Sequence, residues 1–455
     1  WFKPLLMSKL FSEIKSLSRL ALPVALSQLA IMGMGITDVL LAGHAGTDEL
    51  AGLSLGTNIW CVTILFFFGI GLITQALVGR YFGAEDTQAL RQQIHQSMWL
   101  TLACGLLGAL TILLAAEILL FSGFEPMMAA RAHDYLQAIA WGAVPMTMLS
   151  ALRGSLEAMN LTQPVFWINF AVFLLNIPLD YALIYGAWGF PKLGAVGCGW
   201  ATAVLLWVGL FASAAMLQWH KKIRHLQVFK GFSMPDIAII LSTLKLGFPI
   251  GLSVLIEMSM FAGAGMLIAY FGPIAAGAHS IAISIASASF MIYLGFSAGV
   301  IIRASQQLGA KSYAGARYSV KVGTSFNLLL AFLLSIVFWL FREPLVSLYT
   351  SDTAVIRLAA QLLLLGAAFQ VVDCLQAATI AALRAHHDTV SAPKVQMFAY
   401  WLIGLQIAIG LGFYSELPGI SGPHGFWVAM IISLSISGLL LLRRLIKVLA
   451  EQPAN

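Results

Sequence analysis

Twelve apolar runs, each about 18–25 residues long, follow one another along the chain, separated by short breaks rich in charged residues, Gly or Pro. An α-helix rises about 1.5 Å per residue, so roughly 20 apolar residues cross the hydrocarbon core of a bilayer. Of the 455 residues, 60% are hydrophobic and 10% are charged, whereas soluble domains carry about 25% charge. The sequence therefore predicts an all-α polytopic membrane protein. The spans are expected near residues 18–42, 52–78, 95–121, 135–153, 164–185, 196–219, 243–270, 277–301, 320–341, 355–381, 394–414 and 424–446.

Twelve spans put both termini on the same side of the membrane, and the basic residues indicate which side. The opposite side carries only Arg131, Lys192, Arg342 and Arg357, and the other 21 of the 25 Lys and Arg lie on the terminal side. Because Lys and Arg accumulate in cytoplasmic loops, both termini are expected in the cytoplasm. This topology accounts for the net charge of +6, so no nucleic-acid partner is expected.

The second half of the chain repeats the first with a shift of 226 residues. The repeat aligns residues that act at helix entries, turns and cytoplasmic flanks: Pro23/Pro249, Gly69/Gly295, Gly83/Gly309 and Arg91/Arg317. We expect two pseudo-symmetric six-helix bundles, an N-lobe over 7–219 and a C-lobe over 246–448, joined by a cytoplasmic linker loop over 220–245. Substrate sites in such folds lie between or within the lobes near the midplane, and rocking of one lobe on the other gives alternating access.

Four acidic residues fall inside the predicted spans, at Asp38, Asp180, Glu257 and Asp373. A carboxylate near the bilayer centre costs roughly 2.5–3.5 kcal/mol on insertion scales. Such residues usually face the bundle interior or a wet cavity and mark ion or substrate pathways. No Lys or Arg is expected at their depth. The four acids therefore predict a transporter that handles cations.

In the first half, Asn176 and Asp180 are spaced i, i+4 and share a helix face. Pro178 lies between them and removes one backbone N–H, which can free a carbonyl oxygen. Together with Asp38 these groups form an all-oxygen set, which suits a hard cation such as Na⁺. Interhelical hydrogen bonding is the simpler alternative for this polar set.

In the second half, Glu257 and Asp373 form the other candidate cation set. Burial and a neighbouring like charge both favour the protonated form of a carboxyl group, so H⁺ is as open as Na⁺. Aromatic faces can hold organic cations, and Met side chains adapt to varied shapes. With Asp38, Glu257 and Asp373, the apolar side chains expected to line a substrate cavity are Met258, Met260, Phe290, Met291 and Phe369. The spacing of Cys61, Cys104, Cys198 and Cys374 indicates neither a zinc site nor a disulfide framework.

Several segments resemble the multidrug and toxic compound extrusion (MATE) family, most closely its NorM branch, along nearly the whole chain. They include LALPVALSQLAIMGMGITDVLLAGHAGTDELAGLSLG at 20–56, LLNIPLDYALIYG at 174–186, PKLGAVGCGWATA at 191–203, LGFPIGLSVLIEMSMF at 246–261, FQVVDCLQ at 369–376 and GFWVAMIISL at 425–434. The resemblance implies a cation-coupled antiporter that exports organic cations and amphiphilic drugs in exchange for Na⁺ or H⁺, and so confers antibiotic resistance. It also implies a monomer without a cofactor in the bacterial inner membrane.

By this resemblance, Glu257 and Asp373 match the NorM cation-site acids, and Asp38 matches the acid of the N-lobe. Asn176 and Asp180 match the Na⁺ ligands of other branches, so the chain carries both sets and the coupling lobe stays open. In many relatives a Tyr stands four residues before the acid that matches Asp373, and this chain has Phe369 at that position. The Pro found in span 11 of many relatives is replaced by Leu405-Gln406, so no proline hinge is expected there.

Two other functions compete with antiport. A lipid-linked oligosaccharide flippase of the same superfamily is expected to line its cavity with Lys and Arg for pyrophosphate, but the basic residues here lie at flanks or in loops. An intramembrane enzyme is expected to show a catalytic motif, and neither an HExxH sequence nor a Ser/His pairing is present. The sequence therefore predicts a transporter and no enzyme activity.

Overall fold

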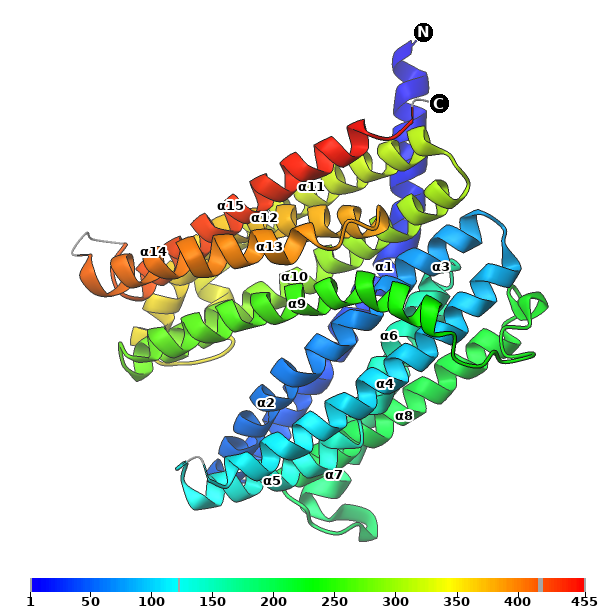
Figure 1. Ribbon diagram of the computed structural model, residues 1–455. Coiled ribbons are helices and arrows are strands. Elements are labelled where there is room, and N and C mark those ends of the chain that lie inside the picture. The colour runs from blue at the N-terminus through cyan, green and yellow to red at the C-terminus, as the bar shows by residue number, and fades with distance from the viewer. Residues whose placement is uncertain (1, 122, 416–419, 454–455) are drawn as a thin grey trace. The chain divides into compact units, whose positions relative to one another are not determined.

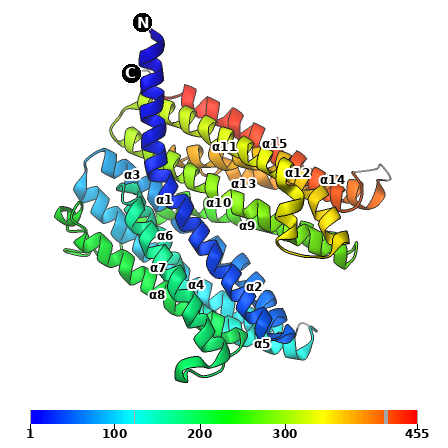
Figure 2. The ribbon, with the colours of Figure 1, turned by 180° about the vertical axis from the view of Figure 1, so that it is seen from behind.

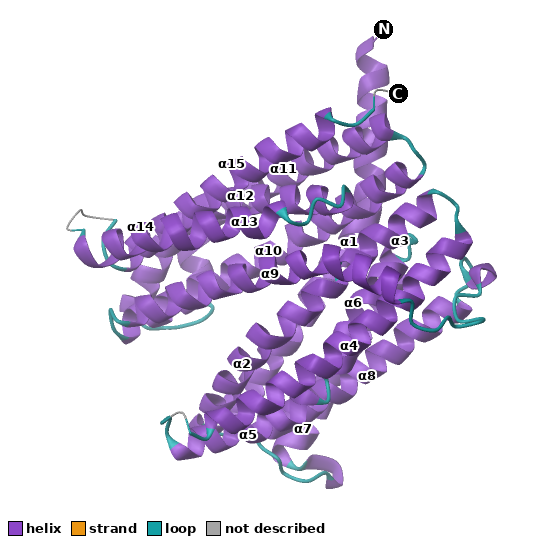
Figure 3. Cartoon of the chain, viewed as in Figure 1, coloured by secondary structure: helices purple, strands orange, loops and turns teal. Residues whose placement is uncertain are grey.

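The computed structural model describes residues 2–121, 123–415 and 420–453, apart from the side chains of 2–7, 47 and 48. All regular elements in these ranges are helical (Figure 3), so the predicted all-α class is confirmed. Among the described residues, 11 helices are long and apolar enough to cross a membrane, or up to 12 if one bent pair counts as a span. That pair, α5 (Pro126–Ala140) and α6 (Ala143–Ala158), is bent by 46° where a single straight span was expected.

The chain forms two compact units, and two long helices each belong to both. Unit 1 contains Trp1–Ala25 and Ile256–Asn455, and unit 2 contains Leu26–Leu255. The units are thus divided within α1 (Phe2–Ala45) and α9 (Ile237–Ala269). The irregular segment between α8 and α9 ends at Asp236, so the last nine residues of the expected 220–245 loop begin a helix.

Unit 2 is built from seven complete α-helices, two short 3₁₀ turns, and parts of α1 and α9 (Figure 1). Helix α4 packs against α2 and α6, and α7 lies beside α8. The segment before α9 is held on α4, where Trp99 Nε1 donates to the Ser233 carbonyl at 3.1 Å. The other elements of this unit are α2 (Thr47–Gly71), α3 (Ile73–Gly83), α4 (Thr87–Leu119), α7 (Thr162–Tyr185), η1 (Ala187–Gly189), α8 (Ala195–Trp219) and η2 (Arg224–Leu226).

In unit 1, α12 packs against α10, α11 and α15 (Figures 1 and 2). The first part of α1 is fastened to α10 by Arg303, whose Nη2 and Nε donate to Glu13 at 2.8 and 3.3 Å. The elements of unit 1 after α9 are α10 (Pro273–Gly309), α11 (Tyr313–Ser347), α12 (Thr353–Ala385), α13 (Ser391–Gln396), η3 (Met397–Gly404), α14 (Leu405–Ile409), η4 (Gly410–Tyr414) and α15 (Pro423–Ala450).

The eleventh predicted span departs from regular α-helix. Its segments η3 and η4 have π-helical hydrogen bonding, with each bond reaching one residue further than in an α-helix. The sequence predicted no proline hinge here, and residues 394–414 contain no Pro. Helix α7, in contrast, stays continuous through Pro178.

The internal repeat is visible as one close helix crossing in each unit. In unit 2, a Cβ added to Gly69 of α2 would lie 2.8 Å from the Cα of Gly251 in α9. In unit 1, a Cβ added to Gly295 of α10 would lie 2.4 Å from the backbone N of Ala25 in α1. Gly69 and Gly295 are repeat partners, and so are Ala25 and Gly251, since both pairs differ by 226. Each unit therefore uses the same small-residue crossing, made by a helix from the other half of the sequence.

Replacing Gly295 with Ala is expected to destabilise the protein by about 1–3 kcal/mol, because the new methyl group meets backbone atoms that cannot rotate away. Gly263→Ala is the matched control, since Gly263 is also helical, also in unit 1, and has no atom within 4 Å of an added Cβ. Thermal unfolding of the detergent-purified protein measures the difference. Equal unfolding midpoints for the two variants would contradict this account of the crossing.

Candidate cation sites in the two units

Three helices of unit 2 bring the first set of acids together. Asp38 lies on α1, Asn176 and Asp180 lie one turn apart on α7, and Cys198 lies on α8. The Asn176 Nδ2 donates to Asp38 Oδ1 at 3.4 Å, and the Cys198 thiol donates to the Asp38 backbone carbonyl at 3.9 Å. Thr202 follows Cys198 by one turn on the same face of α8. We call these five residues the Asp180 cluster.

The Asp180 cluster brings two carboxyl groups together, and neither makes an ion pair within the described residues. A carboxylate oxygen of Asp38, one of Asp180 and the Cys198 sulfur all lie within 4.8 Å of one another. Asp180 and Asn176 are 0% exposed, and neither Asp180 oxygen has a hydrogen-bond partner. Two adjacent carboxylates repel each other strongly in a low-dielectric interior. A shared proton or a bound cation would remove that repulsion, so the arrangement can serve as a cation site.

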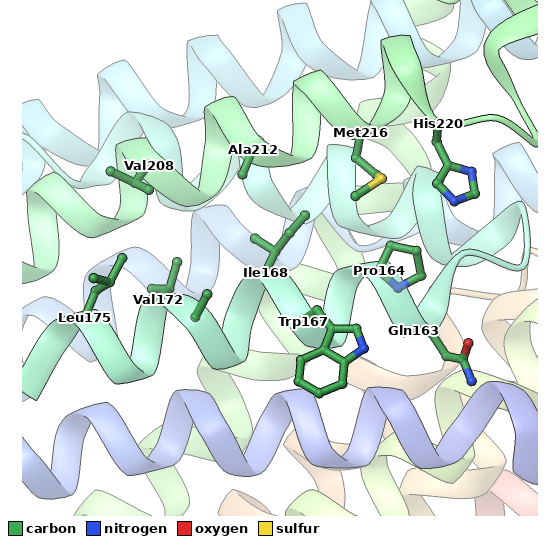
Figure 4. A pocket seen from close by; sticks show the side chains of 11 residues that line it. Gln163, Pro164, Trp167, Ile168, Val172, Leu175, Val208, Ala212, Met216 and His220 are labelled. Carbon is green, nitrogen blue, oxygen red and sulfur yellow. The ribbon is translucent and has the colours of Figure 1, made fainter.

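Another, mostly apolar face of α7 borders a groove. This groove, of about 530 Å³, lies between α7 and α8 and contains none of the four acids (Figure 4). Leu175 and Val172 of α7 face Val208 and Ala212 of α8 across it. The polar side chains of Asn176 and Asp180 thus lie in the interior of unit 2 and not in this groove. The full lining is Gln163, Pro164, Trp167, Ile168, Ala171, Val172, Leu175, Val208, Ala212, Met216 and His220.

The second set of acids lies within unit 1. Asp373 of α12 is 3% exposed and accepts a hydrogen bond from the Tyr293 hydroxyl of α10. Glu257, on the part of α9 that belongs to unit 1, is close enough to Asp373 for charge repulsion. The Tyr293 carbonyl in turn accepts from Asn327 Nδ2 of α11 at 3.0 Å. We call Glu257, Tyr293, Asp373 and Gln396 the Asp373 cluster.

Span 11 supplies the amide of this cluster from α13 and a phenol from the π-helical η3 that follows. Gln396, the residue before η3, donates from Nε2 to Glu257 Oε2 at 3.4 Å. Tyr400, within η3, donates from its hydroxyl to Gln376 Oε1 at 2.5 Å. Because π-helical turns re-aim side chains and often occur at functional sites, the irregular geometry is consistent with a role in the cluster.

One basic side chain lies near enough to Glu257 for its charge to act on that carboxyl group. Arg384, near the end of α12, interacts favourably with its charge. The basic-residue count had assigned Arg384 to the cytoplasmic flank. The contact is not an ion pair within 4 Å, and none of the four acids makes such a pair in the described part of the chain. Glu257 is thus partly compensated, whereas Asp180 is not.

The predicted lining residues occupy different environments. Met258, Met260, Phe290 and Met291 are half-buried. Phe369 is 2% exposed, with ring centroids 6.0 Å from Phe261 and 5.7 Å from Trp427. It therefore packs inside unit 1 as an aromatic core residue. Phe290 packs edge-on against Tyr293 at 5.2 Å and connects the lining residues to the Asp373 cluster.

Sequence reasoning missed several polar residues at both clusters. Tyr293 supplies a hydroxyl to Asp373 from α10, although the Tyr expected on α12 is Phe369. Cys198 had been assigned no metal site, because its partners are far away in sequence. The only available signal was a polar side chain inside an apolar span, and many such side chains have no function. The missed residues are Tyr293, Gln396, Arg384, Cys198 and Thr202.

Comparisons with known proteins agree with this architecture. A model of the MatE family matches residues 23–182 and 249–409. Multidrug resistance protein MdtK of Yersinia pseudotuberculosis is 32% identical over 452 residues, which is 98% of each chain. Probable multidrug resistance protein NorM of Shewanella oneidensis is 34% identical, over 95% of this chain and 94% of its own length. The predicted NorM-like resemblance is therefore confirmed.

Solved structures show the same fold. The Vibrio cholerae MATE transporter VcmN has a TM-score of 0.87 at 21% identity, with 97% of this chain and 98% of VcmN covered. The eukaryotic MATE transporter AtDTX14 has a TM-score of 0.86 at 18% identity, with the same coverage. The chain is a multi-pass membrane protein and a transporter, not an enzyme. It belongs to the MatE family.

Proposed function

We propose that this protein is a cation-coupled multidrug exporter that exchanges organic cations and amphiphilic drugs for Na⁺ or H⁺. The observation that carries the proposal is a pair of carboxylate clusters, one in each unit, each with one fully buried acid and one half-buried acid, and none of these acids makes an ion pair within 4 Å among the described residues. Relatives named multidrug resistance proteins, at 32–34% identity, support the substrate class. Intramembrane acids of this kind typically mark ion and substrate pathways.

The mechanism follows from competition for the same negative charge. A drug cation is held by carboxylates while the transporter is open to the cytoplasm. After the predicted lobes rock to open the other side, Na⁺ or H⁺ neutralises the acids and releases the drug. The coupling ion and the drug both bind to the same unoccupied, unprotonated carboxylates. Binding of either one therefore weakens binding of the other, and this negative coupling is reciprocal.

Membrane voltage constrains the stoichiometry. One positive charge moving inward gains about 2.3 kcal/mol per 100 mV. A monovalent drug leaving in exchange for one Na⁺ or H⁺ moves no net charge, so the ion gradient alone must drive that exchange. The two acidic clusters would accommodate a second ion, which would add the voltage to the driving force.

Ethidium efflux from proteoliposomes tests the function and identifies the ion. The purified protein is reconstituted, loaded with ethidium, and exposed to an imposed Na⁺ gradient or an imposed pH gradient in separate experiments. We expect one gradient, or both, to accelerate efflux above the rate of protein-free vesicles. Efflux that responds to neither gradient would refute cation coupling.

Tyr293→Phe is expected to slow efflux by roughly 10- to 100-fold, since a hydrogen bond to a charged group contributes about 1.5–3 kcal/mol. The substitution removes only the hydroxyl that holds Asp373. Tyr349→Phe is the matched control, because Tyr349 is 51% exposed in the same unit. Efflux by both variants is measured under the effective gradient, and equal rates would remove Tyr293 from the site.

We further propose that the protein works as a monomer in the bacterial inner membrane, with both termini cytoplasmic and with no cofactor. The asymmetry of Lys and Arg supports this orientation. Exposed apolar side chains on several helices, including Leu107, Phe211 and Trp339, support a lipid-facing exterior. Accessibility of single introduced cysteines to a membrane-impermeant reagent in intact cells measures the orientation.

A further inference from the structure

Cys198 lies beside the two carboxyl groups of the Asp180 cluster, and antiport does not require a thiol there. It is 0% exposed, and its sulfur lies within 4.8 Å of oxygens from Asp38 and Asp180. Within the described residues, no other three His, Cys, Asp or Glu side chains gather this closely. The thiol makes one weak contact, to the Asp38 backbone carbonyl at 3.9 Å, so its sulfur is available to a better ligand.

The oxygen atoms around this thiol provide an independent sign of a cation site. Both carboxylate oxygens of Asp180 and the amide oxygen of Asn176 are fully buried and have no hydrogen-bond partner. Buried polar atoms are nearly always satisfied, so three unpartnered acceptors in one place need an explanation. A positive ion among them would satisfy all three.

The donor set identifies the chemical class of that ion. Na⁺ prefers oxygen ligands, whereas sulfur with carboxylate oxygens favours Zn²⁺ and its softer relatives. Around one Zn²⁺, with bonds of about 2.0–2.3 Å, tetrahedral ligand atoms stand roughly 3.5 Å apart. The three donor atoms are already within 4.8 Å, so small side-chain rotations would bring them onto one ion.

We propose that Asp38, Asp180 and Cys198 form a site for one thiophilic divalent cation, such as Zn²⁺ or Cd²⁺, which blocks the Asp180 cluster. The thiol proton leaves to solvent when the ion binds, because the thiolate is the ligand. The binding step stands apart from the proposed function. The inhibition of transport rests on the proposed function, because occupation of the Asp180 cluster would inhibit only an antiporter that uses this cluster.

Cadmium binding to the purified full-length chain tests the site directly. One variant keeps Cys198 as its only cysteine, through Cys61→Ala, Cys104→Ala and Cys374→Ala. The matched control keeps only Cys104, which is also buried and also in unit 2 but has no acidic partners. The readout is the ultraviolet charge-transfer absorption of a cadmium–thiolate bond during a Cd²⁺ titration.

We expect one Cd²⁺ per chain in the variant with Cys198 and no band at the same concentrations in the variant with Cys104. Adding Asp180→Asn to the Cys198 variant should weaken the affinity by at least 10- to 100-fold, the loss typical of disturbed metal sites. No band with Cys198, equal bands in both variants, or an affinity unchanged by Asp180→Asn would overturn the proposal.

Inhibition of ethidium efflux by Cd²⁺ then tests the block. Each protein is compared with its own cadmium-free rate, and Cys198→Ser is used beside Cys198→Ala because Ser preserves more of the packing. We expect half-inhibition at a Cd²⁺ concentration on the order of 10- to 100-fold higher in both variants than in the wild type. A cadmium–thiolate band without inhibition of efflux would refute the block. Failure of the wild type to export ethidium in the absence of Cd²⁺ would instead refute the proposed function.

Discussion

Replacing Asp373 with Asn is expected to abolish drug efflux. The carboxyl group of Asp373 is 3% exposed, accepts a hydrogen bond from Tyr293 and shares its surroundings with Glu257. An amide of the same size cannot carry the negative charge that binds a cation. Removal of one partner from a buried charge interaction costs about 2–5 kcal/mol, which corresponds to roughly 30-fold to several-thousand-fold in affinity.

The control for this substitution is Glu343→Gln, which removes one negative charge from an exposed position of the same unit. We expect efflux by this variant to match the wild type, because an exposed charge is screened by water and salt. Ethidium efflux under the effective ion gradient is the measurement. Efflux by Asp373→Asn at the wild-type rate would exclude this carboxylate from transport.

Asp180→Asn is expected to abolish coupled transport and, at the same time, to stabilise the protein. Its carboxylate is 0% exposed, has no hydrogen-bond partner, and faces the Asp38 carboxyl group. Neutralising the buried carboxylate of Asp180 removes its repulsion with the half-buried Asp38 and lowers its own desolvation penalty. A gain in stability with a loss of activity is the mark of a residue kept for function.

Two measurements on the same preparation test this second prediction. The thermal unfolding midpoint, measured in detergent without added Na⁺, should rise by about 1 °C for each kcal/mol gained, because the unfolding entropy of a 455-residue chain is large. Asp134→Asn, an exposed acid in unit 2, should change neither the midpoint nor efflux. A lower midpoint for Asp180→Asn would mean that the carboxylate has a stabilising partner, and the cation-site interpretation of the cluster would fail.

The fold was largely predictable because membrane spans are a property of local sequence. Apolar runs of sufficient length locate the helices, and the shift of 226 residues locates the repeat. The bend between α5 and α6 was not predictable, since neither hydropathy nor Pro marks the break at Trp141 and Gly142. The π-helical turns of span 11 were missed for a similar reason, because they arise without Pro.

The candidate sites were predictable only in part. Acids inside apolar spans are conspicuous, and the i, i+4 spacing of Asn176 and Asp180 fixes their shared face on α7. Which residues of other helices meet them depends on the rotation and depth of each helix, and sequence periodicity does not contain that information. Cys198 and Tyr293 are the clearest examples, since each reaches its acid from a different helix.

The central claim, that ions and drugs compete for these carboxylates and are exchanged, is tested most directly by running the exchange backwards. Proteoliposomes without any ion gradient receive an ethidium gradient, and the movement of radioactive sodium and of protons is followed together with ethidium. Because coupling is reciprocal, the wild type should move Na⁺ or H⁺ against the direction of ethidium, and both Asp373→Asn and Asp180→Asn should move neither. Ethidium transport by the wild type with no accompanying ion movement would contradict the account.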